Sequence, residues 1–327
     1  MQQKLLQKIE AIEKELQSDP TSPVLWFQLL SRFNADDTLH AHPKRIESIL
    51  RYIQNNPRDT LCKTPFVRMC PDKSKDGYET IKALWDQLLK EHGNDTDIVQ
   101  GAASYYCVEN IEYAKQLLQN ALKNDPSQAD LWLDLGRYST DAKERLYYFK
   151  EARKHASKQP NLPIWILMMA LEVDEHETVE ALVKELLAYI KNAQKEYGSQ
   201  LYWSEASNER WEKAFQITSN REAATALVRV ITMHAEYKHY VHTALGYIAL
   251  KNNDIDAALE HLIESGNVMS TPRLSSYGPT FFLAKKLCYE KKWEAVEQYL
   301  ELCTKFWDNE RLKQYITMVQ SHEIPDF

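Results

Sequence analysis

The stretch from Ala244 to Gly266 reads ALGYIALKNNDIDAALEHLIESG, and it predicts two helices joined by a short turn. One face of the first helix consists of His242, Leu245, Gly246 and Ala249. The turn is Lys251–Asp254, and the matching face of the second helix consists of Ala258, Leu262 and Ser265. These spacings follow the helical period, and so short a connection makes the helices antiparallel neighbours. The stretch therefore predicts a helical hairpin.

The same helical spacing of apolar residues extends over the whole chain, whereas alternating strand patterns and hairpin turns are nearly absent. The longest apolar run, 162–171, has ten residues, and because a membrane span needs ~20 it predicts a buried helix. The expected helices are 3–17, 23–34, 44–56, 62–69, 76–92, 96–107, 111–124, 129–139, 142–157, 163–173, 176–196, 200–217, 220–236, 239–252, 254–266, 276–290, 292–307 and 309–321.

Composition supports the helical interpretation. Only 8 of 327 residues are glycine, about a third of the usual ~7% share, and nucleotide-binding sheets and barrels need glycine for their turns. Three of the glycines, Gly101, Gly136 and Gly246, fall inside expected helices. A glycine there costs ~1 kcal/mol relative to alanine. We therefore expect a neighbouring helix to approach closely at each of the three.

Charge and cysteine content limit the classes of partner and compartment. The formal net charge is −7, so the basic excess that binds nucleic acid or anionic membranes is missing. The five cysteines form no CxxC pair, which is typical of a reducing compartment. The N-terminal segment MQQKLLQKIEAIEKELQ has no apolar core of a secretion signal. We expect a soluble cytoplasmic protein without nucleic-acid or membrane partners and without cofactors.

The two-helix pattern recurs along the chain. Pro126 and Pro160 lie 34 residues apart, and Pro20 and Pro126 each precede a tryptophan, Trp26 and Trp132, by six residues. One unit contains Ile98, Gly101, Ala102, Tyr105, Ala114, Leu118, Ala121 and Pro126. Others contain Trp132, Leu135, Gly136, Phe149 and Ala152, or Leu283, Ala284, Leu287, Val296, Leu300 and Cys303. Such self-similarity is the signature of a repeat protein.

These units resemble the tetratricopeptide repeat, whose pattern is W-x2-L-G-x2-Y followed by A-x3-F and P. About half of the chain matches clearly, while 57–92 and 197–240 match poorly. The resemblance implies an all-α, right-handed superhelical solenoid of about eight antiparallel hairpins in a single domain, 1–327. Its parts would be irregular repeats at 1–92, repeats at 93–196, an irregular pair at 197–240, and repeats with a capping helix at 241–327. The segment SSYGPTFFLAKKL at 275–287 is similar to the C-terminal unit of some bacterial repeat proteins of unknown function.

The resemblance also implies a concave groove that binds a peptide along the inner face of each first helix. The groove positions would be Val99, Ala103, Tyr106, Leu133, Arg137, Tyr240, Thr243, Tyr247, Phe281, Lys285 and Tyr289. Each of these residues is equally explained by packing between helices. Domains of this family that clamp acidic chaperone tails use Lys and Asn where this chain has Val99, Ala103 and Asp134. That clamp is therefore absent, and the sequence predicts a scaffold or adaptor for another protein or peptide.

Two alternatives from other classes remain. His234, His239 and His242 stand at metal-ligand spacing, with Glu236 or His261 as a further ligand, so a metal-binding sensor or enzyme is the second hypothesis. It lacks the P-C-x-x-C ligands of zinc deaminases. No nucleotide-binding, GxSxG, HExxH or EF-hand motif is present. The third hypothesis is a structural subunit of a larger assembly, because the ends of solenoids need capping.

Overall fold

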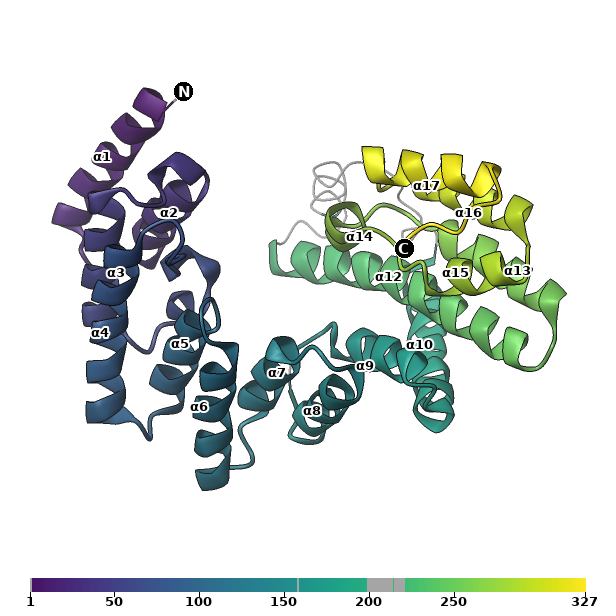
Figure 1. The fold of residues 1–327 in the computed structure, drawn as a ribbon, viewed down its shortest axis with the longest axis horizontal. Helices are drawn as coiled ribbons and strands as arrows, with labels where there is room; N and C mark the ends of the chain where they lie inside the picture. The colour runs from purple at the N-terminus through teal and green to yellow at the C-terminus, as the bar shows by residue number, and fades with distance from the viewer. Residues whose placement is uncertain (1, 158, 199–213, 215–220) are drawn as a thin grey trace. The chain divides into compact units, whose positions relative to one another are not determined.

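A computed structural model describes residues 2–157, 159–198, 214 and 221–327 of the chain. The described residues are helical with connecting turns and contain no strand, which confirms the all-α class. The chain divides into two compact units, Met1–Gln159 (unit 1) and Pro160–Phe327 (unit 2), and each is described by itself (Figure 1). The helix expected at 200–217 lies almost entirely outside the described residues.

Unit 1 is built from helices and three 3-10 turns. These are α1 (Gln2–Ser18), α2 (Pro23–Asn34), η1 (Asp37–Leu39), α3 (Pro43–Asn55), η2 (Thr60–Lys63), η3 (Pro65–Val67), α4 (Lys75–His92), α5 (Thr96–Tyr106), α6 (Ile111–Asn124), α7 (Ala129–Tyr138) and α8 (Ala142–Lys154). In the first helix Ile9, Ile12 and Leu16 are buried, as their spacing predicts.

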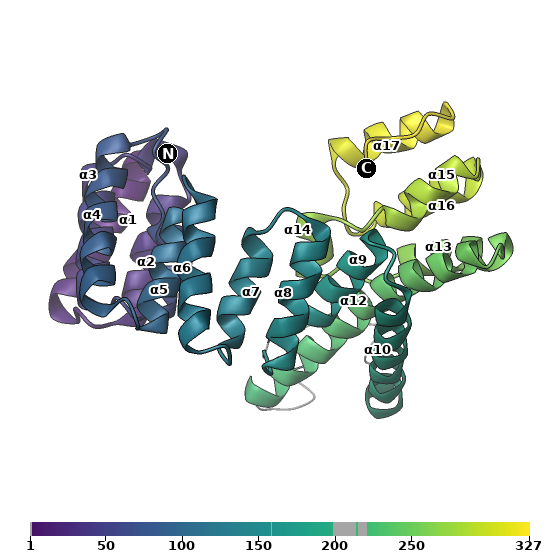
Figure 2. The same cartoon turned by 60° about the horizontal axis from the view of Figure 1, so that its bottom comes forward.

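Four elements of unit 1 follow one another as neighbours and form what we call the first row: α2, η2–η3, α5 and α7. The η3 turn packs on α2, the η2 turn packs on α5, and a hydrogen bond joins α5 to α7. Helices α3, α4, α6 and α8 pack against this row, each beside its neighbour in sequence (Figures 1 and 2). Thus η2–η3, which consists of 3-10 turns, lies between α2 and α5 in this row.

The six-residue spacing from proline to tryptophan has a direct structural cause. The indole Nε1–H of Trp26 donates to the carbonyl of Pro20 at 2.8 Å, and that of Trp132 donates to the carbonyl of Pro126 at the same distance. A tryptophan packed against a helix pair needs an acceptor for this group. The carbonyl of the proline just before the helix supplies it, so the same local link opens α2 and α7.

Unit 2 contains longer and more variable helices. They are α9 (Leu162–Glu172), α10 (His176–Tyr197), α12 (Arg221–Lys251), α13 (Ile255–Gly266), α14 (Pro272–Tyr277), α15 (Phe282–Tyr289), α16 (Trp293–Cys303) and α17 (Glu310–Gln320). Helix α12 packs on α9, α10, α13 and α15, and α16 packs on α13, α15 and α17. Most of α9 is buried, as its apolar run predicts. Within the part of the chain that the structure describes, no helix has the length and apolar character to cross a membrane.

The structure corrects the expected helix at 62–69. Residues 60–67 form two 3-10 turns, η2 and η3, separated by Thr64 in an extended conformation. The cause is Pro65, because the ring of a proline disfavours helical backbone at the preceding residue. The Thr64 side chain then caps η3 by accepting a hydrogen bond from the Phe66 amide.

Two further boundaries differ from expectation. The helices expected at 220–236 and 239–252 are one continuous helix, α12, because the residues between them include no proline or glycine to interrupt it. The helix expected at 276–290 is instead α14 followed by α15, and the break is at Gly278-Pro279. Gly278 has φ +83°, and a Cβ there would lie 2.7 Å from a ring atom of Trp307.

The three helix-interior glycines lie where helices approach closely, as predicted. A Cβ at Gly101 would lie 2.5 Å from the Trp85 ring. At Gly136 it would lie 2.3 Å from the Phe149 ring, and at Gly246 2.3 Å from a methyl of Leu283. Contacts this short are shorter than van der Waals separations. Each glycine therefore makes room for a large side chain of another helix, which belongs to α4 at Gly101, to α8 at Gly136 and to α15 at Gly246.

Candidate functional site: the polar face of the first row in unit 1

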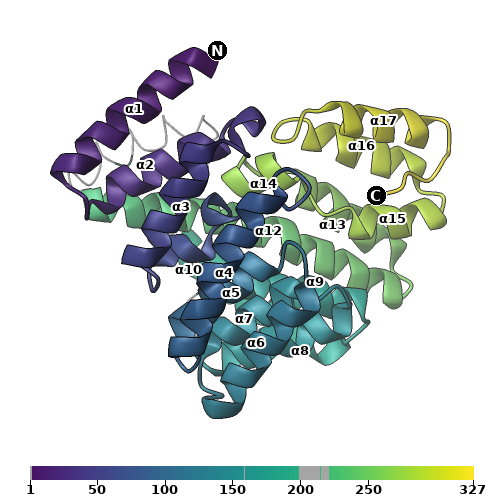
Figure 3. The same ribbon diagram turned by 60° about the vertical axis from the view of Figure 1, so that its left-hand side comes forward.

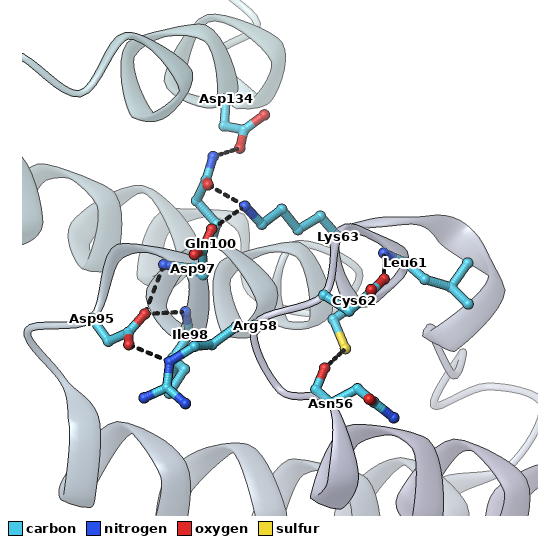
Figure 4. Close-up of polar contacts among 11 residues, drawn as sticks. Asn56, Arg58, Leu61, Cys62, Lys63, Asp95, Asp97, Ile98, Gln100 and Asp134 are labelled. Carbon is cyan, nitrogen blue, oxygen red and sulfur yellow. Dashed lines mark hydrogen bonds and ion pairs between the residues drawn. The ribbon is translucent and has the colours of Figure 1, made fainter. Parts of the chain in front are cut away.

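A chain of polar side chains runs across the first row of unit 1. The ammonium of Lys63, on η2, lies 2.7 Å from a carboxylate oxygen of Asp97 and 2.7 Å from the amide oxygen of Gln100, both on α5. The amide nitrogen of Gln100 donates to Asp134 on α7 at 2.9 Å, and Arg137 donates to the other oxygen of Asp134 at 2.9 Å. Figure 4 shows Lys63, Asp97, Gln100 and Asp134 in this arrangement. Three neighbouring elements of the first row, η2, α5 and α7, thus share one polar face.

Gln100 is the fixed centre of this chain. It is only 4% exposed, and its amide oxygen faces the cation of Lys63 while its amide nitrogen faces the carboxylate of Asp134. The reverse orientation would place NH2 against an ammonium and oxygen against a carboxylate, so both contacts would be repulsive. The two charged neighbours therefore define which way the amide points.

A second contact ties the connecting segment to α5. The guanidinium of Arg68 donates to the Ser104 hydroxyl at 2.9 Å and 3.2 Å, and that hydroxyl donates to the carbonyl of Lys63 at 2.9 Å. Ser104 is buried, so each hydrogen bond is made away from water. The segment that carries Lys63 and Arg68 is held against α5 by these polar contacts.

The N-terminus of α5 adds a capped ion pair to the same edge. Asp95 accepts hydrogen bonds from the backbone amides of Asp97 and Ile98 and pairs with Arg58 at 2.7 Å (Figure 4). Partial burial raises the pKa of Asp95, but the hydrogen bond from Arg58 and those from the helix amides outweigh it and hold the pKa below its usual value. Asp95 is therefore a stable anion at neutral pH.

Asp134 has the opposite balance. Its side chain is 13% exposed, and burial raises the pKa of its carboxyl, while Arg137 and Gln100 oppose the rise. A charge that is removed from water stays ionised only while its partners remain in place. The position of Arg137 therefore affects the ionisation of Asp134 and, through it, the hydrogen bond to Gln100.

The other end of the first row is apolar. Phe27 on α2 is 48% exposed and Val24, one turn before it, is 63% exposed. The Phe27 ring contacts Phe66 of η3 edge to face at 5.4 Å between centroids. A partly exposed aromatic pair at the end of a polar row combines an apolar anchor with hydrogen-bonding groups, as interfaces with proteins and peptides do.

The groove residues expected on α5 and α7 are mostly interior. Val99, Ala103, Tyr106 and Leu133 are at most 4% exposed, and the Tyr106 hydroxyl donates to Asp86 on α4. Arg137 is exposed on α7 and belongs to the polar face. The exposed edge of α5 thus bears Asp97, and the neighbouring polar positions are Gln100 and Ser104.

In unit 2 the expected groove residues are divided between interior and surface. Tyr240, Thr243 and Tyr247 on α12 are at most 6% exposed. Phe281, just before α15, and Lys285, within it, are partly buried. Tyr289, at the end of α15, is 61% exposed. The groove assignment as a whole stays a prediction.

Lys63, Arg68, Gln100 and Ser104 were not among the residues expected from sequence. A signal for two of them is visible in the α5 sequence TDIVQGAASYY: Asp97, Gln100 and Ser104 are polar and stand three and four residues apart in an otherwise apolar segment. Lys63 and Arg68 had no such signal because they belong to irregular backbone.

The histidine cluster is partly committed to hydrogen bonds. His239 Nδ1 lies 2.7 Å from the carbonyl of Ser265, and its Nε2 accepts the amide of Thr280 at 3.0 Å. Both ring nitrogens of His239 are therefore used, and no lone pair remains for a metal. The Nδ1 atoms of His242 and His261 lie 3.1 Å apart, and His234 is buried. Among the described residues no group of three metal-ligating side chains forms a site.

Four of the five cysteines are poor nucleophiles. Burial raises the pKa of the Cys62 and Cys303 thiols to about 12 and that of Cys288 to about 11, and it also raises the pKa of Cys107. A thiol attacks as its thiolate, so these four are protonated and inert at neutral pH.

The polar face of the first row therefore offers hydrogen-bonding groups and charges to a ligand, and no nucleophile among these four cysteines.

Comparison with protein-family models finds no match to this chain, and comparison with curated proteins finds none either.

Proposed function

We propose that the protein is a scaffold or adaptor that binds an extended segment of another protein across the first row of unit 1. The observation that carries the proposal is the continuous chain Lys63–Gln100–Asp134–Arg137, which aligns polar groups from three successive elements on one face. An extended peptide has unpaired backbone groups at regular intervals, and the exposed members of this row, Asp97 and Arg137, supply partners for them. The tetratricopeptide-like pattern, with a right-handed solenoid as its architecture, supports the same function.

The proposal also uses the apolar end of the row. Phe27 and Phe66 provide an anchor for an apolar side chain, while Arg58 and Arg137, 57% and 42% exposed, provide charge beside the polar groups. Interfaces take most of their binding energy from a few aromatic and arginine side chains. We therefore expect a ligand with an apolar residue at one end and an acidic residue at the other.

The test is selection of binders from a random peptide display library on the full-length protein. We expect enriched peptides to share an apolar residue followed by an acidic one. Arg137→Glu places a carboxylate beside Asp134 and removes the cation, so it should weaken a selected peptide at least tenfold. Because Asp134 is only 13% exposed and loses its cation, the variant should also melt at a lower temperature. Peptide affinity is therefore compared at a temperature at which circular dichroism shows both proteins folded.

A matched control is Lys123→Glu, the same charge change at an exposed position of α6, away from the first row. It should leave peptide affinity unchanged. Failure to enrich a shared pattern, or equal affinity of the Arg137→Glu variant and the wild type, would contradict the proposal.

A further inference from the structure

The last six residues of the chain, His322–Phe327, fold back onto unit 2. Helix α17 ends at Gln320, His322 two residues later has φ +59°, and the amide of Glu323 donates to the carbonyl of Met318 at 2.8 Å. This is the hydrogen bond from C″ that closes many helices and reverses the chain. The end of the chain consequently lies beside α15 (Figures 1 and 3).

Aromatic contacts hold the tail at both ends. The His322 ring stacks on Trp293 at 5.4 Å, beside a pocket of about 340 Å³. The Phe327 ring stacks on Phe281 at 4.9 Å and meets Tyr315 edge to face at 5.1 Å. Pro325, between these contacts, is buried. The tail thus contacts aromatic side chains of α16, of α17 and of the residue just before α15.

The tail site, which we define as Phe281, Tyr315 and Trp307, is organised by contacts that do not involve the tail. Phe281 touches Tyr315 at 5.4 Å and Trp307 at 5.8 Å between centroids. The residue before it, Thr280, is held on both sides: its carbonyl accepts the Tyr299 hydroxyl at 2.8 Å and its amide donates to His239 at 3.0 Å. A site whose walls are fixed in advance binds without an ordering cost.

Few hydrogen bonds attach the tail. Within the described structure, residues 324–327 take part in one hydrogen bond. In it the Tyr315 hydroxyl donates to the carbonyl of Asp326 at 3.4 Å. Glu323, Ile324 and Asp326 are exposed. Segments with few buried contacts and few hydrogen bonds open at low free-energy cost. The tail is therefore easier to remove than the site on which it rests.

We propose that the tail site is a docking site for an extended peptide in which proline is followed two residues later by phenylalanine, and that the chain's own tail competes for it. The tail defines the chemistry of the partner: Pro325 is buried, Phe327 stacks on Phe281, and Asp326 contributes its backbone carbonyl. A partner peptide replaces these contacts one for one. The inference concerns unit 2 and does not depend on the function proposed for unit 1.

The probe is a fluorescent peptide with the sequence of residues 321–327, SHEIPDF, measured by anisotropy with the full-length protein. A tethered tail at an effective concentration of about 1 mM weakens a free peptide of about 0.1 mM dissociation constant roughly tenfold. We therefore expect Phe327→Ala to bind the peptide about ten times more tightly than the wild type. Ile324→Ala, a control in an exposed part of the tail, should bind like the wild type.

Three further results decide the proposal. Phe281→Ala in the Phe327→Ala background should abolish binding, as should a probe with alanine in place of its phenylalanine. In the wild type, excess peptide should accelerate amide hydrogen exchange in 322–327, and this readout does not require a folded variant. Equal affinity of wild type and Phe327→Ala, or unchanged exchange, would overturn the proposal. A wild-type dimer that Phe327→Ala converts to monomer would overturn it in favour of a second copy as the occupant.

Discussion

Gly136→Ala is expected to destabilise the protein by about 1–2 kcal/mol, although a glycine-to-alanine change inside a helix ordinarily stabilises by ~1 kcal/mol. The added Cβ would lie 2.3 Å from the Phe149 ring, and that ring is 1% exposed, so it cannot swing into solvent without losing its packing. Overpacking of this kind costs about 1–3 kcal/mol. Urea unfolding of the variant and the wild type measures the difference in the free energy of unfolding.

A double-mutant cycle isolates the contact between the two residues. Phe149→Leu reduces the ring that meets the new methyl group, so Gly136→Ala should be less harmful in that background. We expect a favourable coupling free energy within the range of about 0.5–3 kcal/mol that contacting residues show. Two results would contradict this explanation: a Gly136→Ala variant that is more stable than the wild type, or strictly additive effects of Gly136→Ala and Phe149→Leu. Either would mean that the close approach of α7 and α8 is not the reason why glycine is needed at position 136.

The second expected result is that His239 makes the stability of the protein depend on pH. Burial lowers the pKa of His239 to about 4, and the hydrogen bond to Ser265 only partly opposes this. In the unfolded chain a histidine has a pKa of about 6.5, so between these values the unfolded state binds more protons. The stabilising contribution is complete above pH 6.5 and is lost as pH falls toward 4, by up to about 3 kcal/mol.

Comparison of the wild type with His239→Gln separates the pH dependence caused by His239 from the pH dependence caused by other titrating groups. His40 and His242 also have a pKa lowered to about 4, mainly by burial, and burial raises that of Glu236, so the wild-type profile sums several titrations. Glutamine keeps an acceptor for the amide of Thr280 but does not titrate. The difference between the two unfolding free energies should therefore shrink as pH falls from 6.5 to 4.

An independent measurement is the tautomer of His239 at pH 7. The Nδ1–H donates to the carbonyl of Ser265 and Nε2 accepts from Thr280, so nitrogen NMR of the ring should show the proton on Nδ1. A proton on Nε2, or parallel pH profiles for the variant and the wild type, would contradict this assignment.

Much of the fold could be predicted from sequence because its signals are local. The starts of α2 and α6 and the three close-packing glycines agree with expectation, since capping, period and glycine cost depend on neighbours in sequence. The Pro20–Trp26 and Pro126–Trp132 links are local as well. The helix expected at 62–69 is interrupted at Thr64, because Pro65 disfavours helical backbone at the residue before it.

The candidate site was less accessible to prediction. Helical spacing places Val99, Ala103 and Tyr106 together, but it does not say whether they meet solvent or another helix. In the structure α4, α6 and η2 all pack on α5, so these residues are interior and Gln100 reaches α7 instead. The positions of α4, α6 and η2 together decide this, and that of η2 follows from contacts between residues 34 to 41 apart in sequence.

The sequence by itself determined the helical class, most helix boundaries and the positions where only glycine fits, because backbone period, capping and side-chain volume act over a few residues. Tertiary structure alone decided that 60–67 lies in the first row, that Lys63, Gln100 and Asp134 meet, and that Phe327 returns to Phe281. Such contacts form between residues far apart in sequence. Their energies depend on how surfaces of completed helices fit together, and that information is absent from any short stretch of the chain.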